Sequence, residues 1–191
     1  MEEDENFTNT GFAISTYFGI TGGPIFNASG NEVQVNGDGW RNLEDAHCGD
    51  LYTNGVIIPY RPVSMREITD GTSNTFAIGE RTWQLRSFFA GAFFLGRSPD
   101  KATKICSHSQ KNMRFGISTP EESGYYVFEQ NPPPGALKVV RFNDFYFGSE
   151  HPGGAHFSYA DGSVQFISDD TELNVLQALS TRNGDEMLES R

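Results

Sequence analysis

The sequence predicts an α+β protein that consists mainly of antiparallel β-sheet, with a short helix near the C-terminus. Three observations support this class. The 191 residues include 21 glycines, 9 prolines and 13% aromatic residues, a composition typical of many turns and strands. Residues 155–168 alternate apolar and polar side chains on both sides of an Asp-Gly pair, as a β-hairpin does. The segment after residue 168 carries leucines at helical spacing.

The hairpin is expected to have a two-residue turn at Asp161-Gly162. This register pairs Tyr159 with Val164 and Phe157 with Phe166. Because side chains alternate along a strand, it places four apolar side chains on the buried face: Phe157, Tyr159, Val164 and Phe166. His156 then lies on the opposite, mostly polar face, where Ile167 is an exception.

The helix that follows is expected to begin at Asp169, because aspartate is a favoured N-cap. Glu172 stands three residues further on, the spacing of a capping box. The leucines at helical spacing are Leu173, Leu176 and Leu179. Asn183-Gly184 is typical of a helix C-terminus, so the helix is expected to end near Arg182.

Shorter elements are expected along the rest of the chain. Apolar stretches between turn residues predict strands within 11–20, 33–35, 56–58, 75–83, 88–95 and 125–128. A helical turn is expected within 63–68. At Asp70-Gly71 we expect another turn, because the carboxylate can accept backbone N–H groups and glycine permits positive φ.

The charge and the apolar patterning narrow the function classes. The net charge of −11 and the lack of clustered Lys and Arg argue against nucleic acid as a partner. No apolar run reaches the roughly 18–20 residues of a transmembrane helix, and no signal peptide is recognisable.

We expect residues 1–10 to be a flexible acidic N-terminus and residues 11–191 to form a single β-rich globular head domain. No catalytic signature stands out, so the sequence predicts a non-enzyme.

Three blocks of sequence, taken together, resemble a known family. They are Glu67–Thr75 followed by Ile78-Gly79-Glu80, Gly148–Ile167, and Leu176–Arg182. They are similar to the large planctomycete prepilin-like family, a domain of unknown function named for the pattern His, nine residues, Asp-Gly. His151 and Asp161-Gly162 fit that spacing, and the matching motif residues are His151, Asp161, Gly162, Asp70 and Gly71.

The resemblance implies a pilin-like or pseudopilin-like protein outside the cytoplasm, in the periplasm or at the cell surface. Family members usually begin with a prepilin leader and a long apolar helix, followed by a soluble head. That helix is absent from this sequence, so the membrane would be reached only through a segment that this chain lacks.

Several residues are candidate ligands. Pseudopilin heads can hold calcium, so the resemblance makes calcium a candidate cofactor. The candidate ligands are Asp161, Asp144 and Glu150, with Asp169 and Asp170 as further oxygen donors.

His151 is either a metal ligand, a proton-transfer residue or, as we favour, a side chain that pins its loop by a hydrogen bond. A zinc site at His47-Cys48 and Cys106-Ser107-His108 lacks the usual spacing. Cys48 and Cys106 form either a disulfide or two free thiols.

The sequence therefore predicts a non-enzymatic structural or interaction protein, the soluble head of a pilin-like or pseudopilin-like surface or secretion-associated protein. Its expected partners are other pilin-like subunits or an extracellular ligand at the cell surface. The alternative is a solute-binding or glycan-binding module at the cell surface, which a groove lined by Trp40 and Trp83 would favour.

Overall fold

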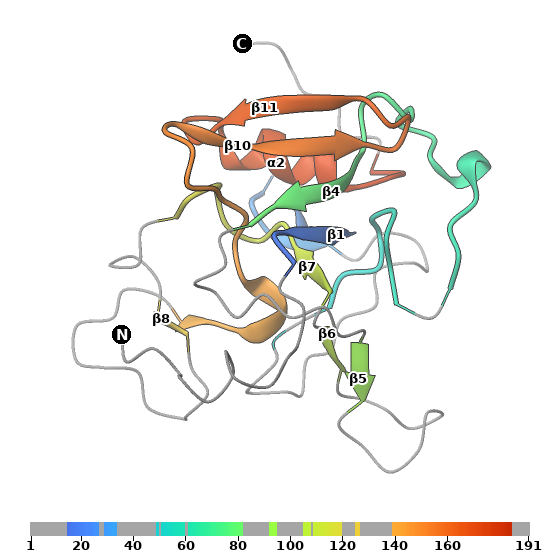
Figure 1. Ribbon diagram of the computed structural model, residues 1–191. Helices are drawn as coiled ribbons and strands as arrows, with labels where there is room; N and C mark the ends of the chain where they lie inside the picture. Colours follow the sequence, from blue (N-terminus) through green and yellow to red (C-terminus); the bar gives the residue numbers. More distant parts are fainter. Residues whose placement is uncertain are drawn as a thin grey trace.

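A five-stranded sheet forms the centre of the computed structural model, with the strand order β11-β10-β4-β1-β7 (Figure 1). The structure describes residues 15–26, 29–33, 49, 51–59, 61–81, 92–94, 105–107, 109–119, 125–126 and 139–184. The strands of this sheet are β1 (Tyr17–Gly22), β4 (Phe76–Glu80), β7 (Gln110–Asn112), β10 (Gly154–Tyr159) and β11 (Val164–Ser168). One short helix, α2 (Leu173–Ser180), packs against β1 and β4 on one face of the sheet. This architecture agrees with the predicted α+β class.

Smaller elements surround the sheet. Pairs of short strands are β2 (Ile25–Phe26) with β3 (Glu32–Val33), β5 (Ala92–Phe94) with β6 (Ile105–Ser107), and β8 (Tyr125–Tyr126) with β9 (Val139–Val140). Two single-turn 3₁₀ helices are η1 (Met65–Glu67) and η5 (Phe142–Asp144). Within the described ranges, no helix is long and apolar enough to span a bilayer.

The strand directions correct one expectation. Most pairs are antiparallel, but β1 pairs with β7 in parallel, as β8 does with β9. The central sheet is therefore mixed. Parallel neighbours need a long connection, and residues 23–109 provide it between β1 and β7. Apolar periodicity carries no information on strand direction, so the sequence did not reveal this pairing.

Two shorter elements also bear on the sequence predictions. The turn expected within 63–68 is confirmed as η1. The strand expected at 56–58 is wrong, because this segment forms a bend that meets β1. The N–H groups of Gly55 and Ile57 donate to the carbonyl oxygens of Thr21 and Ile20.

The core lies between α2 and one face of the sheet. Its buried side chains are Phe18, Ile20, Phe76, Met113, Ile117, Phe147, Ala155, Phe157, Tyr159 and Leu176. The Phe76 and Phe157 ring centroids lie 4.6 Å apart, and the Phe147 and Phe157 centroids 5.6 Å apart. Each buried phenylalanine stabilises the fold by about 1.5–3 kcal/mol, so this aromatic group is a large part of the stability.

The hairpin register differs by one residue from the predicted register. The observed partners are His156 with Phe166, Phe157 with Gln165 and Ser158 with Val164. The N–H of Tyr159 donates to the Ser163 carbonyl oxygen at 2.9 Å, which leaves a loop of three residues, 160–162. Gly162 has a φ of +87°, the left-handed conformation that such a loop requires at its last position.

This shift exchanges the two faces of β11, so each side chain lies on the side of the sheet opposite to the predicted one. Phe157 and Tyr159 are buried, as predicted. The prediction for Val164 and Phe166 is wrong, because their side chains are 62% and 47% exposed on the opposite face. Ile167 instead packs against the core. A change of one residue in loop length exchanges the two faces of a strand.

The helix begins later than expected. Its N-cap is Glu172 and not Asp169. The N–H of Asp169 donates to the Gly153 carbonyl oxygen at 3.0 Å, and the N–H of Thr171 donates to the Ser168 carbonyl oxygen at 3.1 Å. These bonds extend the hairpin and form a turn, so the predicted N-cap position belongs to the end of β11. The helix ends at Ser180.

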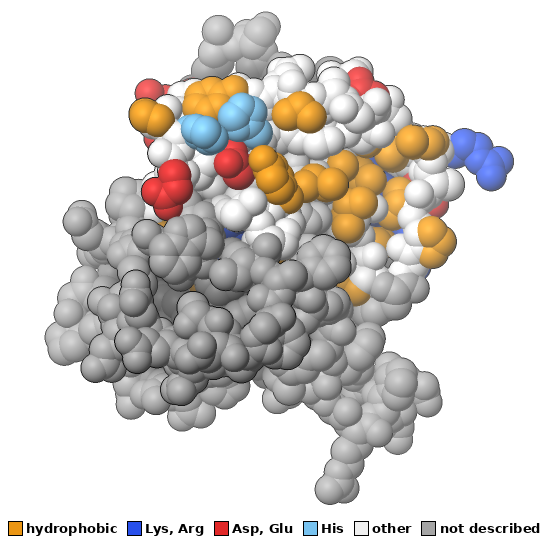
Figure 2. All heavy atoms as spheres, viewed as in Figure 1, with side chains coloured by type: hydrophobic (Ala, Val, Ile, Leu, Met, Phe, Trp, Pro, Cys, Tyr) orange, Lys and Arg blue, Asp and Glu red, His pale blue; other side chains and the backbone are white. Residues whose placement is uncertain are grey.

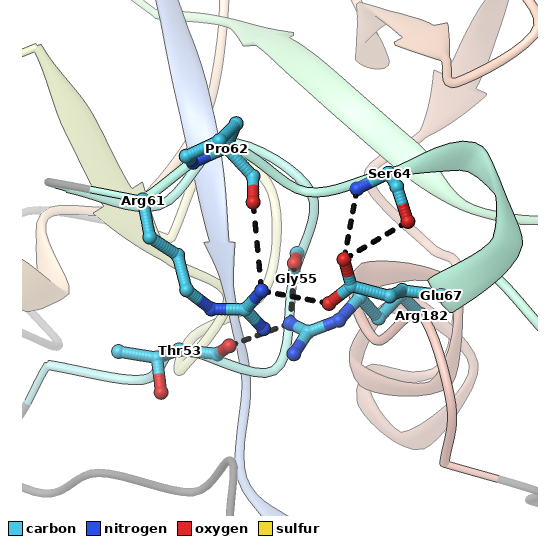
Figure 3. A network of polar contacts seen from close by, with 7 residues as sticks. All are labelled: Thr53, Gly55, Arg61, Pro62, Ser64, Glu67 and Arg182. Carbon is cyan, nitrogen blue, oxygen red and sulfur yellow. Dashed lines mark hydrogen bonds and ion pairs between the residues drawn. The ribbon is translucent and has the colours of Figure 1, made fainter.

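Arg182 connects the end of α2 to the segment beside β1 (Figure 3). Its buried guanidinium donates from Nη1 to the carbonyl oxygens of Thr53 at 2.6 Å and Gly55 at 2.7 Å. Its backbone N–H donates to the Asn54 carbonyl oxygen. The helix is therefore held at its C-terminal end by charge-assisted hydrogen bonds.

The η1 turn is closed by a capping box (Figure 3). Glu67 Oε1 accepts hydrogen bonds from the backbone N–H and the hydroxyl of Ser64, and Glu67 Oε2 lies 2.7 Å from Arg61 Nη1. The backbone bond from Ser64, then the Arg61 bond, lower the pKa of Glu67 to about 2. The carboxylate is therefore ionised at neutral and mildly acidic pH.

We predict that Gly79→Ala lowers the free energy of unfolding by about 1–3 kcal/mol, as overpacking in a core does. A Cβ at position 79 would lie 2.5 Å from a Phe147 ring carbon and 2.7 Å from a Phe157 ring carbon. Gly116→Ala is the control, because its Cβ would meet only the Thr119 hydroxyl at 3.9 Å. Urea denaturation measures both variants, and equal stability of the two would contradict this account of the core.

Candidate functional site on the outer face of the sheet

The face of the sheet that points away from the core, here called the outer face, exposes apolar side chains (Figure 2). Its side chains come from alternating positions of β1, β4, β10 and β11: Tyr17, Ile78, Glu80, His156, Ser158, Val164 and Phe166. The four apolar members are Tyr17, 56% exposed, Ile78, 38%, Val164, 62%, and Phe166, 47%. Single exposed hydrophobic residues are normal, but several on one face of a sheet indicate a binding surface, here with His156, Glu80 and Ser158 between them.

A histidine pair and a carboxylate lie within this face. His156 is in β10, Glu80 ends β4, and His151 stands in the turn before β10. Because Phe157 pairs with Gly79 and Ser158 with Ile78, the strand register places Glu80 beside His156 on the same side of the sheet. Figure 2 shows the two histidines next to each other, close to an acidic side chain and among hydrophobic ones.

Glu80 is the centre of this group. Its Oε2 lies 3.1 Å from His156 Nδ1 and accepts a hydrogen bond from the His156 backbone N–H at 2.9 Å. Its Oε1 lies 3.8 Å from His151 Nε2. The two imidazole rings meet edge to face with centroids 5.3 Å apart. The Glu80 side chain is only 13% exposed, whereas His151 and His156 are 59% and 40% exposed.

The turn that carries His151 is fixed by local hydrogen bonds. The Ser149 hydroxyl accepts from the His151 backbone N–H at 2.9 Å and donates to the Gly154 carbonyl oxygen at 2.7 Å. Gly153 has a φ of +81°, which closes the turn before β10. Ser149 therefore holds this turn through the backbone groups of His151 and Gly154, and the interpretation that the His151 side chain pins its loop stays a prediction.

These three side chains are the one group, among the described residues, in which three or more His, Cys, Asp or Glu ligand atoms converge. The ligand atoms lie within 4.8 Å of one another. Two imidazole nitrogens and a carboxylate oxygen are a donor set that suits zinc, copper and nickel ions.

The other motif residues lie at the opposite end of β4 and β10. Gly71 has a φ of +98°, as expected for its turn. The carbonyl oxygens of Thr75 and Thr72 accept from the N–H groups of Ala160 and Asp161, at 2.8 and 3.0 Å. Asp70 Oδ2 accepts from the Gly184 N–H at 2.8 Å. The two motif turns therefore pack on each other and on the segment after α2.

Asp161 has a structural task in the hairpin loop. Its Oδ1 accepts hydrogen bonds from the Ser163 hydroxyl at 2.7 Å and the Ser163 N–H at 2.9 Å. These two bonds, the hydroxyl bond first, lower the pKa of Asp161. Loop geometry thus accounts for Asp161-Gly162 without a bound ion.

The predicted calcium ligands are not brought together. Asp144 is buried in η5, where its Oδ1 accepts from Asn112 Nδ2 at 2.7 Å. Burial, and then the charge of Arg81, hold the pKa of the neighbouring Lys111 well below its usual range, and the Asp144 carboxylate opposes this shift in part. Glu150 is exposed before β10, and Asp161 lies in the hairpin loop. In the described part of the chain, these three carboxylates form no common ligand group.

The remaining candidates stay predictions. Cys106 lies in β6, whereas Cys48, His47 and His108 lie outside the described residues. The disulfide and the zinc alternative are therefore not tested. Trp40 and Trp83 also lie outside the described residues, and with them the aromatic groove expected for a glycan-binding module.

Sequence reasoning found no identifiable partner for His151 and did not connect it with Glu80. Glu80 stood in a motif block and His156 on an alternating strand, but no local pattern joins residues 80 and 156. The missing information was the antiparallel pairing of β4 with β10. The weak signal available was that Glu80 and His151 both belong to the blocks that carry the family resemblance.

Comparison with known proteins agrees with the family level of that resemblance. Residues 8–174 match the family model described as "Protein of unknown function (DUF1559)". This match covers most of the 191 residues, so the chain belongs to that family. No curated protein and no solved structure matches the chain.

We predict that Asp161→Asn lowers the melting temperature at neutral pH and that the difference from wild type closes in acid. A carboxylate whose pKa is lower in the folded state stabilises the fold above its unfolded pKa of about 3.9. This contribution is lost as the pH falls through the lower, folded value. Melting curves between pH 7 and about pH 2 measure the effect.

Asp170→Asn is the matched control, since it removes an exposed carboxylate at the other end of β11. If the difference in melting temperature between Asp161→Asn and wild type stayed constant from neutral to acid pH, it would contradict the claim that the Ser163 hydrogen bonds stabilise the ionised form of Asp161.

Proposed function

We propose that this chain is a non-enzymatic structural or interaction protein and that its outer face is the contact surface for another copy of the chain. The observation that carries the proposal is the exposure of Tyr17, Ile78, Val164 and Phe166 on one side of one sheet. These apolar side chains cost free energy while they are hydrated, so their burial between two subunits favours association.

The position of β11 adds to this argument. It is an end strand of the five-stranded sheet, so one of its edges has no strand neighbour within the described part of the chain. An open edge offers backbone N–H and C=O groups to another strand. Because β11 also carries Val164 and Phe166, its edge and its exposed side chains are available to the same partner.

The finer assignment follows from the resemblance of the motif blocks. We propose a pilin-like or pseudopilin-like head that functions outside the cytoplasm, in the periplasm or at the cell surface. Its proposed partners are like subunits, and subunit contact, with no chemical step, is the proposed activity. Membership of a family of unknown function is compatible with this assignment and does not decide it.

We predict that Val164→Asp and Phe166→Asp each weaken self-association at least tenfold, which corresponds to about 1.4 kcal/mol. A buried, unpaired carboxylate opposes contact strongly. Sedimentation velocity over a concentration series in about 0.15 M salt measures the association, because this salt screens repulsion between chains of net charge −11.

Met65→Asp is the matched control. Met65 is 67% exposed, close to the 62% of Val164, but it lies in η1 and not in the sheet. This variant is expected to associate like wild type. A wild-type chain that remains monomeric up to about 1 mM would contradict self-association through this face.

A further inference from the structure

We propose that Glu80, His151 and His156 bind a divalent transition-metal ion of the zinc type on the outer face. The inference goes beyond the proposed subunit contact and does not depend on it, because all three ligands belong to one chain. The site would take Zn²⁺, or a similar ion such as Co²⁺ or Ni²⁺, through two imidazole nitrogens and one carboxylate oxygen.

The distances fit such an ion. Tetrahedral zinc with bonds of about 2.0–2.2 Å holds its ligand atoms about 3.4 Å from one another. Here Glu80 Oε1 lies 3.8 Å from His151 Nε2 and Glu80 Oε2 lies 3.1 Å from His156 Nδ1, and one ligand atom from each residue lies within 4.8 Å of the others. Rotation of the two partly exposed imidazole side chains would bring their nitrogens closer to the carboxylate.

The donor chemistry selects the class of ion. Imidazole nitrogens favour zinc, copper and nickel, whereas calcium requires six to eight oxygen ligands. The group offers two nitrogens beside one carboxylate, so it is poorly suited to bind calcium or magnesium ions. This selectivity separates the site from the calcium site expected from the family resemblance.

The central ligand is held in place before any ion binds. The Glu80 carbonyl oxygen accepts from the Gly148 N–H at 3.0 Å, and its Oε2 accepts from the His156 backbone N–H at 2.9 Å. The Phe166 ring packs edge to face on the His156 ring with centroids 5.2 Å apart. A preorganised carboxylate and a supported imidazole reduce the entropy lost on binding.

The site leaves room for a further ligand. Three protein ligands occupy three corners of a tetrahedron, and the exposed sides of His151 and His156 face solvent. The fourth position is therefore filled by water in the isolated chain. This is the arrangement of an open metal site and differs from a closed structural one.

Isothermal titration of the metal-free, untagged chain with Zn²⁺ tests the inference. We expect binding of one ion that His151→Ala weakens at least tenfold and that His156→Ala also weakens. Glu150→Gln is the control for a nearby exposed acid outside the group and is expected to bind like wild type. The double variant His47→Ala, His108→Ala removes the other two histidines of the chain and is expected to keep the binding.

Two further readouts separate loss of ligand from loss of fold. Bound Co²⁺ is expected to give the intense visible d–d absorption of a four-coordinate ion in wild type, and only the weak absorption of hydrated Co²⁺ is expected with His151→Ala. The metal-free melting temperature of this variant stays that of wild type because His151 is exposed. Saturating Zn²⁺ is expected to raise the melting temperature of wild type but not that of His151→Ala.

Zn²⁺ binding that persists in the double variant His151→Ala, His156→Ala would overturn the proposal. Displacement of Zn²⁺ by Ca²⁺ at a similar concentration would overturn it as well. An absence of Zn²⁺ binding by wild type would overturn it too, and none of these outcomes bears on self-association.

Discussion

Two backbone hydrogen bonds join the tip of the β10–β11 hairpin to the turn before β4. The N–H groups of Ala160 and Asp161 donate to the carbonyl oxygens of Thr75 and Thr72. They determine which residue of β10 faces which residue of β4, and the rest of the structure depends on that register. With it, Phe157 lies over Gly79 in the core, and Glu80 lies beside His156 on the outer face.

The motif residues occupy the two ends of this strand pair. The pattern from His151 to Asp161-Gly162 covers β10 from the turn before it to the loop after it. At the loop end, the positive φ of Gly162 and the hydrogen bonds from Ser163 to Asp161 stabilise the hairpin loop. At the other end, Glu80 lies beside His151 and His156. The same spacing therefore specifies a turn and positions a group with its own chemistry. Only the second of these tasks points to a ligand.

Sequence reasoning succeeded where the pattern was local. The inward positions of Phe157 and Tyr159 follow from alternation along β10 and do not depend on the loop. Val164 and Phe166 were misplaced because Asp161-Gly162 is compatible with two-residue and three-residue loops, which orient β11 oppositely. Asp169 is a favoured N-cap type, but it continues the hairpin through its bond to Gly153, and the helix begins only after Glu172. The parallel β1–β7 pair and the Glu80–His156 contact join residues far apart in sequence, where no periodicity exists to read.

The outer face owes its apolar character to the loop of three residues, because that loop directs Val164 and Phe166 away from the core. The group of Glu80, His151 and His156 depends on the pairing of β4 with β10, and the proposed contact surface depends on the hairpin register. Cross-strand nuclear Overhauser effects measure it directly in solution. The account predicts contacts between the rings of His156 and Phe166, whose centroids lie 5.2 Å apart, and between the α protons or amides of Phe157 and Gln165. Contacts of the Phe166 ring with the buried Phe76 and Phe157 rings, and pairing of Tyr159 with Val164, would contradict it.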